Sequence, residues 1–274
     1  MDFLKPYLLL IFFFLFLISC RTKTIQRVPW EDKPVPDLIT EHFEVYSEPS
    51  LKLEDYREQI MDAERIWKSF QKDFFPGAGN QKKIRLIIYG NQKSYSRYRR
   101  VPIDSLADFE RREKRINISV DAPVTVWKHE LSHAMLETAR PGSPFWLHEG
   151  LALFLQAQHF QYPVSCTNLQ KAAMPYSLSL YIEEVRDDNN PIPGEFRPRS
   201  RRPTPESQST LAGYFVFYLW DQKKLSKFLH PYQNSKKRAT EFLAGGKKKE
   251  TEKLFLDFKK WLHTARPLME IPGC

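Results

Sequence analysis

The stretch WKHELSHAMLE (residues 127–137) carries two histidines four positions apart, and it constrains the fold more than any other feature of the chain. On an α-helix, His129 and His133 project from one face, close enough for both imidazoles to bind one ion. Glu130 lies about 100° round the helix, where its carboxylate can border the ion without binding it. A fold that uses this pattern must bring a third ligand to the helix.

The third ligand separates a metal site from a chance HExxH pattern. Glu137 lies about 12 Å along the helix axis from His129, which is too far to share an ion, so we expect it to be a surface carboxylate. Glu149 is the better candidate, because the turn at residues 140–143 would fold its helix back against the first one. His148 is a rival ligand that would point elsewhere, toward the cleft or the surface.

Two histidines, a carboxylate ligand and a neighbouring glutamate form the arrangement for metal-assisted hydrolysis, with Glu130 as the general base. Zinc is the preferred metal, since sites of this composition suit it and it lowers the pKa of bound water toward ~7. Gly150, directly after Glu149, would let the two helices approach closely.

The segment FWLHEGLALF (residues 145–154) resembles the W-x-x-E-G-x-A signature that follows HExxH in gluzincin metallopeptidases. The matching residues are Trp146, Glu149, Gly150 and Ala152. The order of elements is also similar to that of the bacterial peptidase MA-like, or DUF1570-like, gluzincins: an HF-x-V strand at residues 42–45, a long helix, a strand, HELSH, EGLA and a later helix. The resemblance covers most of the mature chain.

The resemblance implies that His129, His133 and Glu149 bind one Zn2+ per chain. It implies that Glu130 activates the zinc-bound water for attack on a peptide bond of a peptide or protein substrate. It further implies that the strand RINISVD (residues 115–121) holds the extended peptide by β-augmentation. Relatives often carry an oxyanion-stabilising Tyr where Ser209 stands here, which leaves Tyr214 as a weak oxyanion candidate and a core role for it open.

The expected fold class is α+β, in a gluzincin-like peptidase domain over residues 38–274. It comprises a small N-terminal α/β lobe with a mixed sheet, the active-site helix pair and a mostly helical C-terminal part. Hydrophobic periodicity predicts strands at 42–48, 83–90 and 115–121 and helices at 53–75, about 121–138, 143–156, 179–188, 210–229 and 251–265. Asp121 is the expected N-cap of the HELSH helix, with Pro123 in its first turn. Residues 191–208, rich in proline and arginine, predict an exposed loop.

Residues 1–19 predict a lipoprotein signal peptide, because the apolar run at residues 7–18 is short for a bilayer span. Ser19-Cys20 at its end resembles the bacterial lipobox, which implies cleavage before Cys20 and lipid anchoring of Cys20 to a membrane of the cell envelope. Arg21 favours the outer membrane over the inner one. Residues 20–37 predict a polar tether.

The formal net charge of +9 is concentrated in arginine and lysine clusters, for which solvated surface is the favoured interpretation and contact with an anionic surface partner the alternative. No nucleic-acid motif accompanies them. Cys166 and Cys274 could form a disulfide in an oxidising compartment. The alternative function is a catalytically weak or inactive zinc-binding lipoprotein that acts as a binding protein, although a purely structural site would need only the ligands and not Glu130.

Overall fold

The computed structural model describes residues 30, 33–76, 78, 83–99, 104–157, 205–235, 239, 243 and 248–264. Within them the chain has the α+β composition that the sequence predicts. The predicted signal peptide, Cys20, the helix expected at 179–188, Cys166, Cys274 and most of the loop expected at 191–208 lie outside the described residues.

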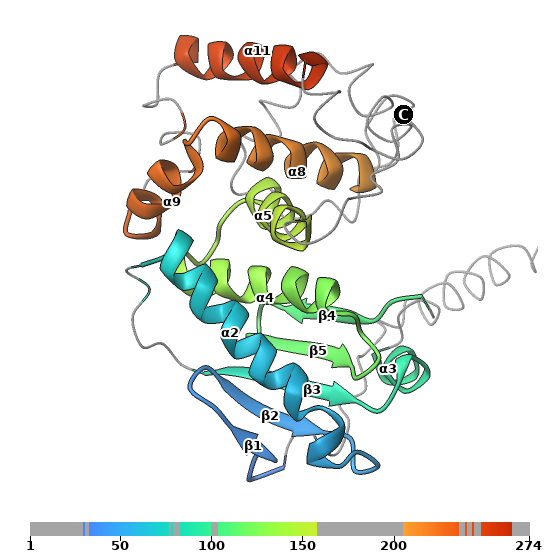
Figure 1. Cartoon of the computed structure of the whole chain (residues 1–274). Helices are drawn as coiled ribbons and strands as arrows, with labels where there is room; N and C mark the ends of the chain where they lie inside the picture. The colour runs from blue at the N-terminus through green and yellow to red at the C-terminus, as the bar shows by residue number, and fades with distance from the viewer. Residues whose placement is uncertain are drawn as a thin grey trace, which may run out of the picture.

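A mixed five-stranded sheet forms one layer of the fold (Figure 1). Its strands follow the order β1-β2-β3-β5-β4, in which β2, β3 and β5 run parallel and the edge strands β1 and β4 are antiparallel to their neighbours. The strands are β1 (Leu38–Ile39), β2 (Phe43–Ser47), β3 (Ile84–Tyr89), β4 (Ala107–Glu110) and β5 (Arg115–Ser119). The expected strands correspond to β2, β3 and β5, whereas β1 and β4 were not predicted.

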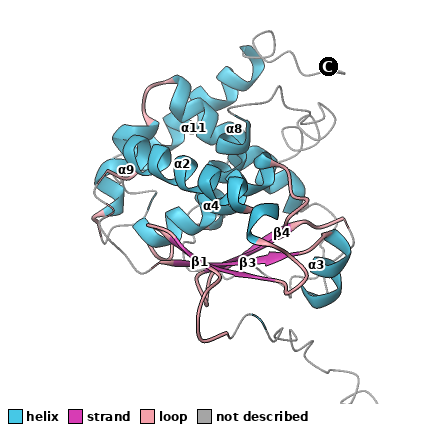
Figure 2. Ribbon diagram, turned by 60° about the horizontal axis from the view of Figure 1, so that its bottom comes forward, coloured by secondary structure: helices cyan, strands magenta, loops and turns pink. Residues whose placement is uncertain are grey.

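Helices α2 and α4 pack on one face of the sheet, and α5, α8 and α11 follow in successive layers beyond α4 (Figures 1 and 2). A short 3-10 helix, η2 (Leu53–Asp55), leads into α2. The helices are α2 (Arg57–Phe74), α3 (Gln92–Arg99), α4 (Val124–Ala139), α5 (Phe145–Ala157), α8 (Pro205–Asp221), α9 (Leu225–Gln233) and α11 (Lys248–Thr264). Helix α8 begins at a proline, which is favoured at a first helical position, so the irregular loop ends earlier than expected.

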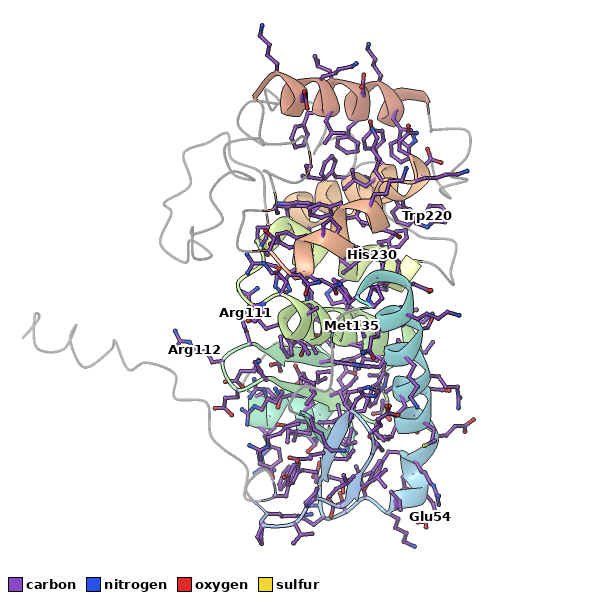
Figure 3. All side chains as sticks on the ribbon, turned by 90° about the vertical axis from the view of Figure 1, so that its left-hand side faces the viewer. Glu54, Arg111, Arg112, Met135, Trp220 and His230 are labelled. Atoms are coloured by element: carbon purple, nitrogen blue, oxygen red, sulfur yellow. The ribbon has the colours of Figure 1, made fainter. Side chains whose placement is uncertain are left out.

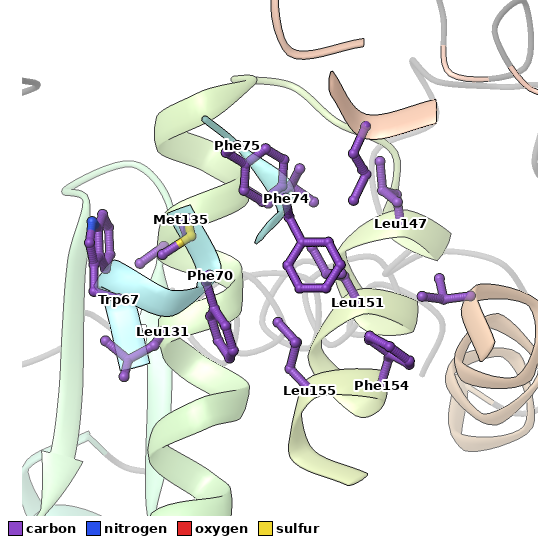
Figure 4. Close-up of a cluster of buried hydrophobic side chains, with 14 of the residues drawn as sticks. Trp67, Phe70, Phe74, Phe75, Leu131, Met135, Leu147, Leu151, Phe154 and Leu155 are labelled. Atoms are coloured by element: carbon purple, nitrogen blue, oxygen red, sulfur yellow. The ribbon is translucent and has the colours of Figure 1, made fainter. Parts of the chain in front are cut away.

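The main hydrophobic core lies between the sheet and its helices and continues between the helices themselves. Alternate side chains of the three parallel strands, such as Val45, Leu86 and Ile118, are fully buried, as expected for strands with one face against helices. Figure 4 shows side chains of α2, α4 and α5 meeting in one cluster, with Phe70 and Phe74 beside Leu131 and Leu151. Helices α4 and α5 are therefore fixed to each other by packing that is independent of any metal.

The other face of the sheet carries a small aromatic cluster that includes Trp30, which is 7% exposed. Its indole ring contacts Tyr98 edge to face, with ring centroids 4.9 Å apart, and lies 6.1 Å from Tyr89. Trp30 falls within the segment expected to be a free tether. The folded domain therefore reaches back at least to this residue.

A buried polar network attaches edge strand β4 to α3 and β5. Asp108 accepts hydrogen bonds from Arg99 (Nε, 3.0 Å), Tyr95 (Oη, 2.7 Å) and Asn117 (Nδ2, 3.1 Å). Glu110 accepts from Arg99 (Nη2, 3.1 Å) and from Arg115, which is only 2% exposed. Paired buried charges of this kind fix the position of a short strand that has few residues to pair.

Two helix boundaries differ from the prediction. Pro123 itself is the N-cap of α4, with extended backbone angles, while the Asp121 carboxylate accepts a hydrogen bond from the backbone N–H of Gln92. The helix expected at 210–229 is two helices, because Lys223 has a positive φ of 53° and the chain turns there between α8 and α9. The apolar pattern continues across the break, so periodicity alone does not reveal it.

No helix among the described residues has the length and apolarity needed to cross a bilayer.

Candidate metal centre

Helix α4 presents His129 and His133 from adjacent turns, as the four-residue spacing predicts. Their ring centroids are 4.8 Å apart and their planes are nearly perpendicular. The helix is held on both sides, since Leu131 packs toward the sheet and α2 while the opposite face meets α5. The two imidazoles therefore lie at the contact between α4 and α5.

Glu149 reaches the same place from α5. The chain reverses between the two helices at Gly142, whose φ of +74° is accessible to glycine without strain. Glu149 Oε1 then lies 3.6 Å from His133 Nε2, and one donor atom from each of His129, His133 and Glu149 lies within 4.8 Å of the others. Two histidines and one carboxylate are the protein ligands of a common class of catalytic zinc site. The donor set and its spacing therefore fit a zinc ion.

The protonation states of these groups also suit a cation. Burial lowers the pKa of His129, and it lowers that of His133 well below its usual value, with further lowering by the neighbouring His129, His148 and Arg111. Both imidazoles are therefore neutral near pH 7, and a neutral imidazole is the form that binds a metal. Burial raises the pKa of Glu149, and a nearby cation would favour its ionised form.

Glu130 is 8% exposed and lies beside β4, where the backbone N–H of Phe109 donates a hydrogen bond to it. Burial is the main reason that its pKa rises to about 8, and the negative charges of Asp108 and Glu149 raise it further. A carboxyl group with a pKa near neutrality can both accept and release a proton at physiological pH, which is what a general base and acid must do.

This pKa predicts how stability depends on pH in protein kept free of divalent metals with EDTA. Because the folded-state pKa of Glu130 exceeds its usual value of 4.5, the unfolded state loses this proton first as pH rises, so stability falls between about pH 5 and pH 8. The free energy of unfolding should fall by at most on the order of 4 kcal/mol over this range. Glu130→Gln should not show this decrease when its free energy of unfolding is measured in urea at both pH values. The histidines act equally in both proteins and cancel in the comparison, and an unchanged pH dependence would contradict the prediction.

Two further side chains touch the candidate ligands, and sequence reasoning did not find either contact. Gln156 Oε1 lies 3.0 Å from His129 Nδ1. The Ser209 hydroxyl, at the start of α8, donates a hydrogen bond to the Glu149 carboxylate. Gln156 follows Glu149 by seven residues, or about two helical turns, so the helical period could have identified it. The resemblance marks position 209 only as the place of an oxyanion-stabilising Tyr, and the contact of Ser209 with Glu149 was not predicted.

The atoms nearest to a side chain at position 150 belong to α8, whereas the expectation was a close approach of the two site helices. A Cβ at position 150 would lie 2.6 Å from the backbone oxygen of Ala212 and 2.7 Å from Val216 Cγ2. The glycine therefore allows α8 to approach α5 directly behind Glu149. The same approach brings Ser209 to the Glu149 carboxylate.

Glu137 and His148 are both buried, at 7% and 5% exposed, which corrects their expected places at the surface or cleft. Arg111 lies on the β4–β5 turn, and its Nε atom is 3.0 Å from Glu137 Oε2. His148 Nε2 lies 3.6 Å from the same oxygen. Figure 3 shows Arg111 and Arg112 on this turn. The charge of Arg111 allows Glu137 to be buried, a tertiary contact that the helix pattern does not reveal.

The strand expected to hold a peptide, RINISVD, is β5, which pairs with β3 on one side and β4 on the other. It has no free edge. The edge strand next to α4 is β4.

Tyr214 is 5% exposed and belongs to the main core, in agreement with a packing role. A second His/Glu group, made of Glu41, His42 and Glu64, also brings three donor atoms together. There Lys68 Nζ lies 2.7 Å from Glu41 and His42 Nδ1 lies 2.7 Å from Glu64. These contacts within the chain satisfy the group without a cation.

No known family model matches the chain, and no curated protein sequence is significantly similar to it.

Proposed function

We propose that the chain is a zinc-dependent metallopeptidase that hydrolyses peptide bonds. The observation that carries the proposal is the meeting of His129, His133 and Glu149 within 4.8 Å beside a buried Glu130 whose pKa is raised to about 8. A structural zinc site needs four protein ligands and no base. Three ligands with an adjacent proton acceptor favour hydrolysis over a purely structural role.

In the proposed reaction, zinc would be held by His129, His133 and Glu149 and would polarise the attacking water and the scissile carbonyl. Glu130 takes the proton from the water as the carbonyl is attacked. It then gives the proton to the leaving amine, so the base returns to its starting state. The hydrogen bond from the Phe109 N–H keeps the Glu130 carboxylate at β4 throughout, where a bound peptide would lie.

The backbone of β4 offers the substrate a free edge. The Ser119 N–H donates a hydrogen bond to the Leu106 carbonyl, which makes these two residues a hydrogen-bonded pair of the antiparallel ladder. Because hydrogen-bonded and non-hydrogen-bonded pairs alternate, the N–H and C=O groups of Ala107 and Phe109 point away from β5. The Phe109 N–H contacts Glu130. Within the part of the chain that the structure describes, the N–H and C=O groups of Ala107 and the C=O group of Phe109 therefore remain for an extended peptide.

We further propose that the protein acts at a membrane of the bacterial cell envelope, with the outer membrane favoured, through a lipid on Cys20. The support is the apolar segment that ends at Ser19-Cys20. The formal net charge of +9 of the chain would favour contact with anionic partners.

The metal content of the full chain, purified in detergent without chelators, tests the proposal. Wild type should contain one zinc per chain by mass spectrometry, while His133→Ala and Glu149→Ala should contain little, because each loses one of only three ligands. His230→Ala is the matched control: this histidine lies on α9 (Figure 3), 3.3 Å from the Asp73 carbonyl, away from the centre.

The outcomes separate the two candidate functions. Zinc in wild type together with cleavage of a peptide library supports the peptidase. Zinc without cleavage of any peptide supports the binding lipoprotein. Wild type without stoichiometric zinc would overturn both.

A further inference from the structure

We propose that Gln156 is a positioning residue that fixes the imidazole of His129 for metal binding and moderates the affinity of the site. The inference rests on the proposed zinc site. It concerns a residue outside the ligand set and outside the HExxH and W-x-x-E-G-x-A patterns.

The geometry that supports this role is a single hydrogen bond, from His129 Nδ1 to Gln156 Oε1 at 3.0 Å. An amide oxygen is only an acceptor, so Nδ1 must carry the proton and Nε2 must carry the lone pair. The tautomer that results presents Nε2 to a metal. Without this acceptor, the ring could rotate about its side-chain bonds or take the other tautomer.

The placement of Gln156 makes the constraint rigid. It lies on α5 two turns after Glu149, so one helix supplies both the third ligand and the partner of the first ligand. Leu155, the residue directly before Gln156, is 1% exposed in the core and holds this end of the helix against its neighbours. A shift of α5 would therefore disturb two ligands together.

The chemical identity of the acceptor determines how strongly the imidazole donates to a metal. Metal-bound histidines commonly give their second N–H to a carboxylate, a carbonyl or water, and a carboxylate raises the basicity of the ligand most. A neutral amide at position 156 orients His129 with less of this effect. The site should therefore bind zinc less tightly than the same site with a glutamate there, while keeping the ring in place.

Two substitutions of similar shape separate orientation from packing. Gln156→Met keeps the length of the side chain and removes the acceptor, and it should weaken zinc binding about 10–100-fold. Gln156→Glu keeps the acceptor and adds charge, and it should bind zinc at least as tightly as wild type. Gln222→Met is the matched control, because Gln222 is exposed directly after α8, where its side-chain amide donates a hydrogen bond to Asp221.

The measurement is the zinc dissociation constant of the full chain in detergent, obtained by competition with a chromophoric chelator. The absorption spectrum of the Co2+ form provides a second readout, since loss of a fixed His129 should change the ligand-field bands of Gln156→Met and not those of the control. Thermal unfolding in EDTA checks that each variant folds. If Gln156→Met does not fold, Gln156→Glu alone still tests the proposal, because binding weaker than in wild type would overturn it.

The failures of the two proposals are distinguishable. Wild type that binds zinc together with Gln156→Met that binds within twofold of it would overturn the positioning role and leave the zinc site intact. If Gln156→Met and Gln156→Glu weaken zinc binding equally, Gln156 acts through packing alone and the positioning role is wrong. Wild type that binds no zinc would overturn the proposed function, and this inference with it.

Discussion

Glu130→Gln should lower kcat for peptide cleavage by about 10³-fold or more while the protein keeps one zinc per chain. General acid and base catalysis contributes roughly 10²–10⁴-fold, and in the proposed mechanism Glu130 serves in both roles. A 10³-fold loss corresponds to about 4 kcal/mol in the activation free energy. Glutamine preserves the size of the side chain and removes the proton acceptor, so the ligands should stay in place. Cleavage of a fluorescence-quenched peptide library and zinc analysis of the same samples measure both quantities.

Glu64→Gln is the matched control for this variant. Glu64 is another buried glutamate, on α2, but its partner is His42 and it lies in the second His/Glu group, away from α5. Its substitution should leave kcat within a few-fold of wild type. Cleavage by Glu130→Gln at the wild-type rate would mean that another group accepts the proton, and the assignment of the base would be wrong.

The sequence predicts the central part of the candidate site because that part depends on local geometry. His129 and His133 share a face through the helical period alone, and the turn at Gly142 with a second apolar helix is enough to indicate that Glu149 returns to them. The structure brings these three side chains together. Their roles as ligands stay a proposal until the metal is measured.

The remainder of the site depends on contacts between segments distant in the chain, for which one sequence carries no signal. Glu137 has the pattern of a surface residue, and its burial is explained by partners from other segments, namely Arg111 on the β4–β5 turn and His148 on α5. Edge strand β4 has four residues and no clear alternation, so its position is fixed by the buried network around Asp108 and not by its own propensity. Ser209 is sixty residues from Glu149 and meets it only because α8 packs on α5.

The same reasoning applies to the long C-terminal apolar pattern. Continuous periodicity predicts one helix at 210–229, yet the backbone at Lys223 turns and starts α9. The residues after the turn, including Phe228, are buried against other parts of the core, for example Trp146 with ring centroids 6.2 Å apart. Tertiary packing overrides the local pattern here, as it commonly does.

Gly150→Ala should lower the free energy of unfolding by at least about 1–3 kcal/mol, because its Cβ would lie 2.6 Å from the backbone oxygen of Ala212. Backbone atoms cannot rotate away as a side chain can, so α8 must move from α5. That movement would also withdraw the Ser209 hydroxyl from Glu149, and zinc affinity should fall with stability. Urea unfolding and chelator competition on the same preparation measure the two effects.

Gly213→Ala provides the contrast from the other side of the same helix contact. Its Cβ would lie 3.1 Å from Leu153 Cβ and 3.2 Å from Leu153 Cδ1, so a displacement of a few tenths of an ångström between the two helices relieves the crowding, in contrast to the 2.6 Å contact at Gly150. The higher helix propensity of alanine, worth about 1 kcal/mol over glycine, then offsets the remaining cost. Gly213→Ala should therefore unfold close to the wild-type urea midpoint. If Gly150→Ala behaves in the same way and binds zinc as wild type does, α8 does not approach α5 closely behind Glu149, and Ser209 has no part in holding that carboxylate.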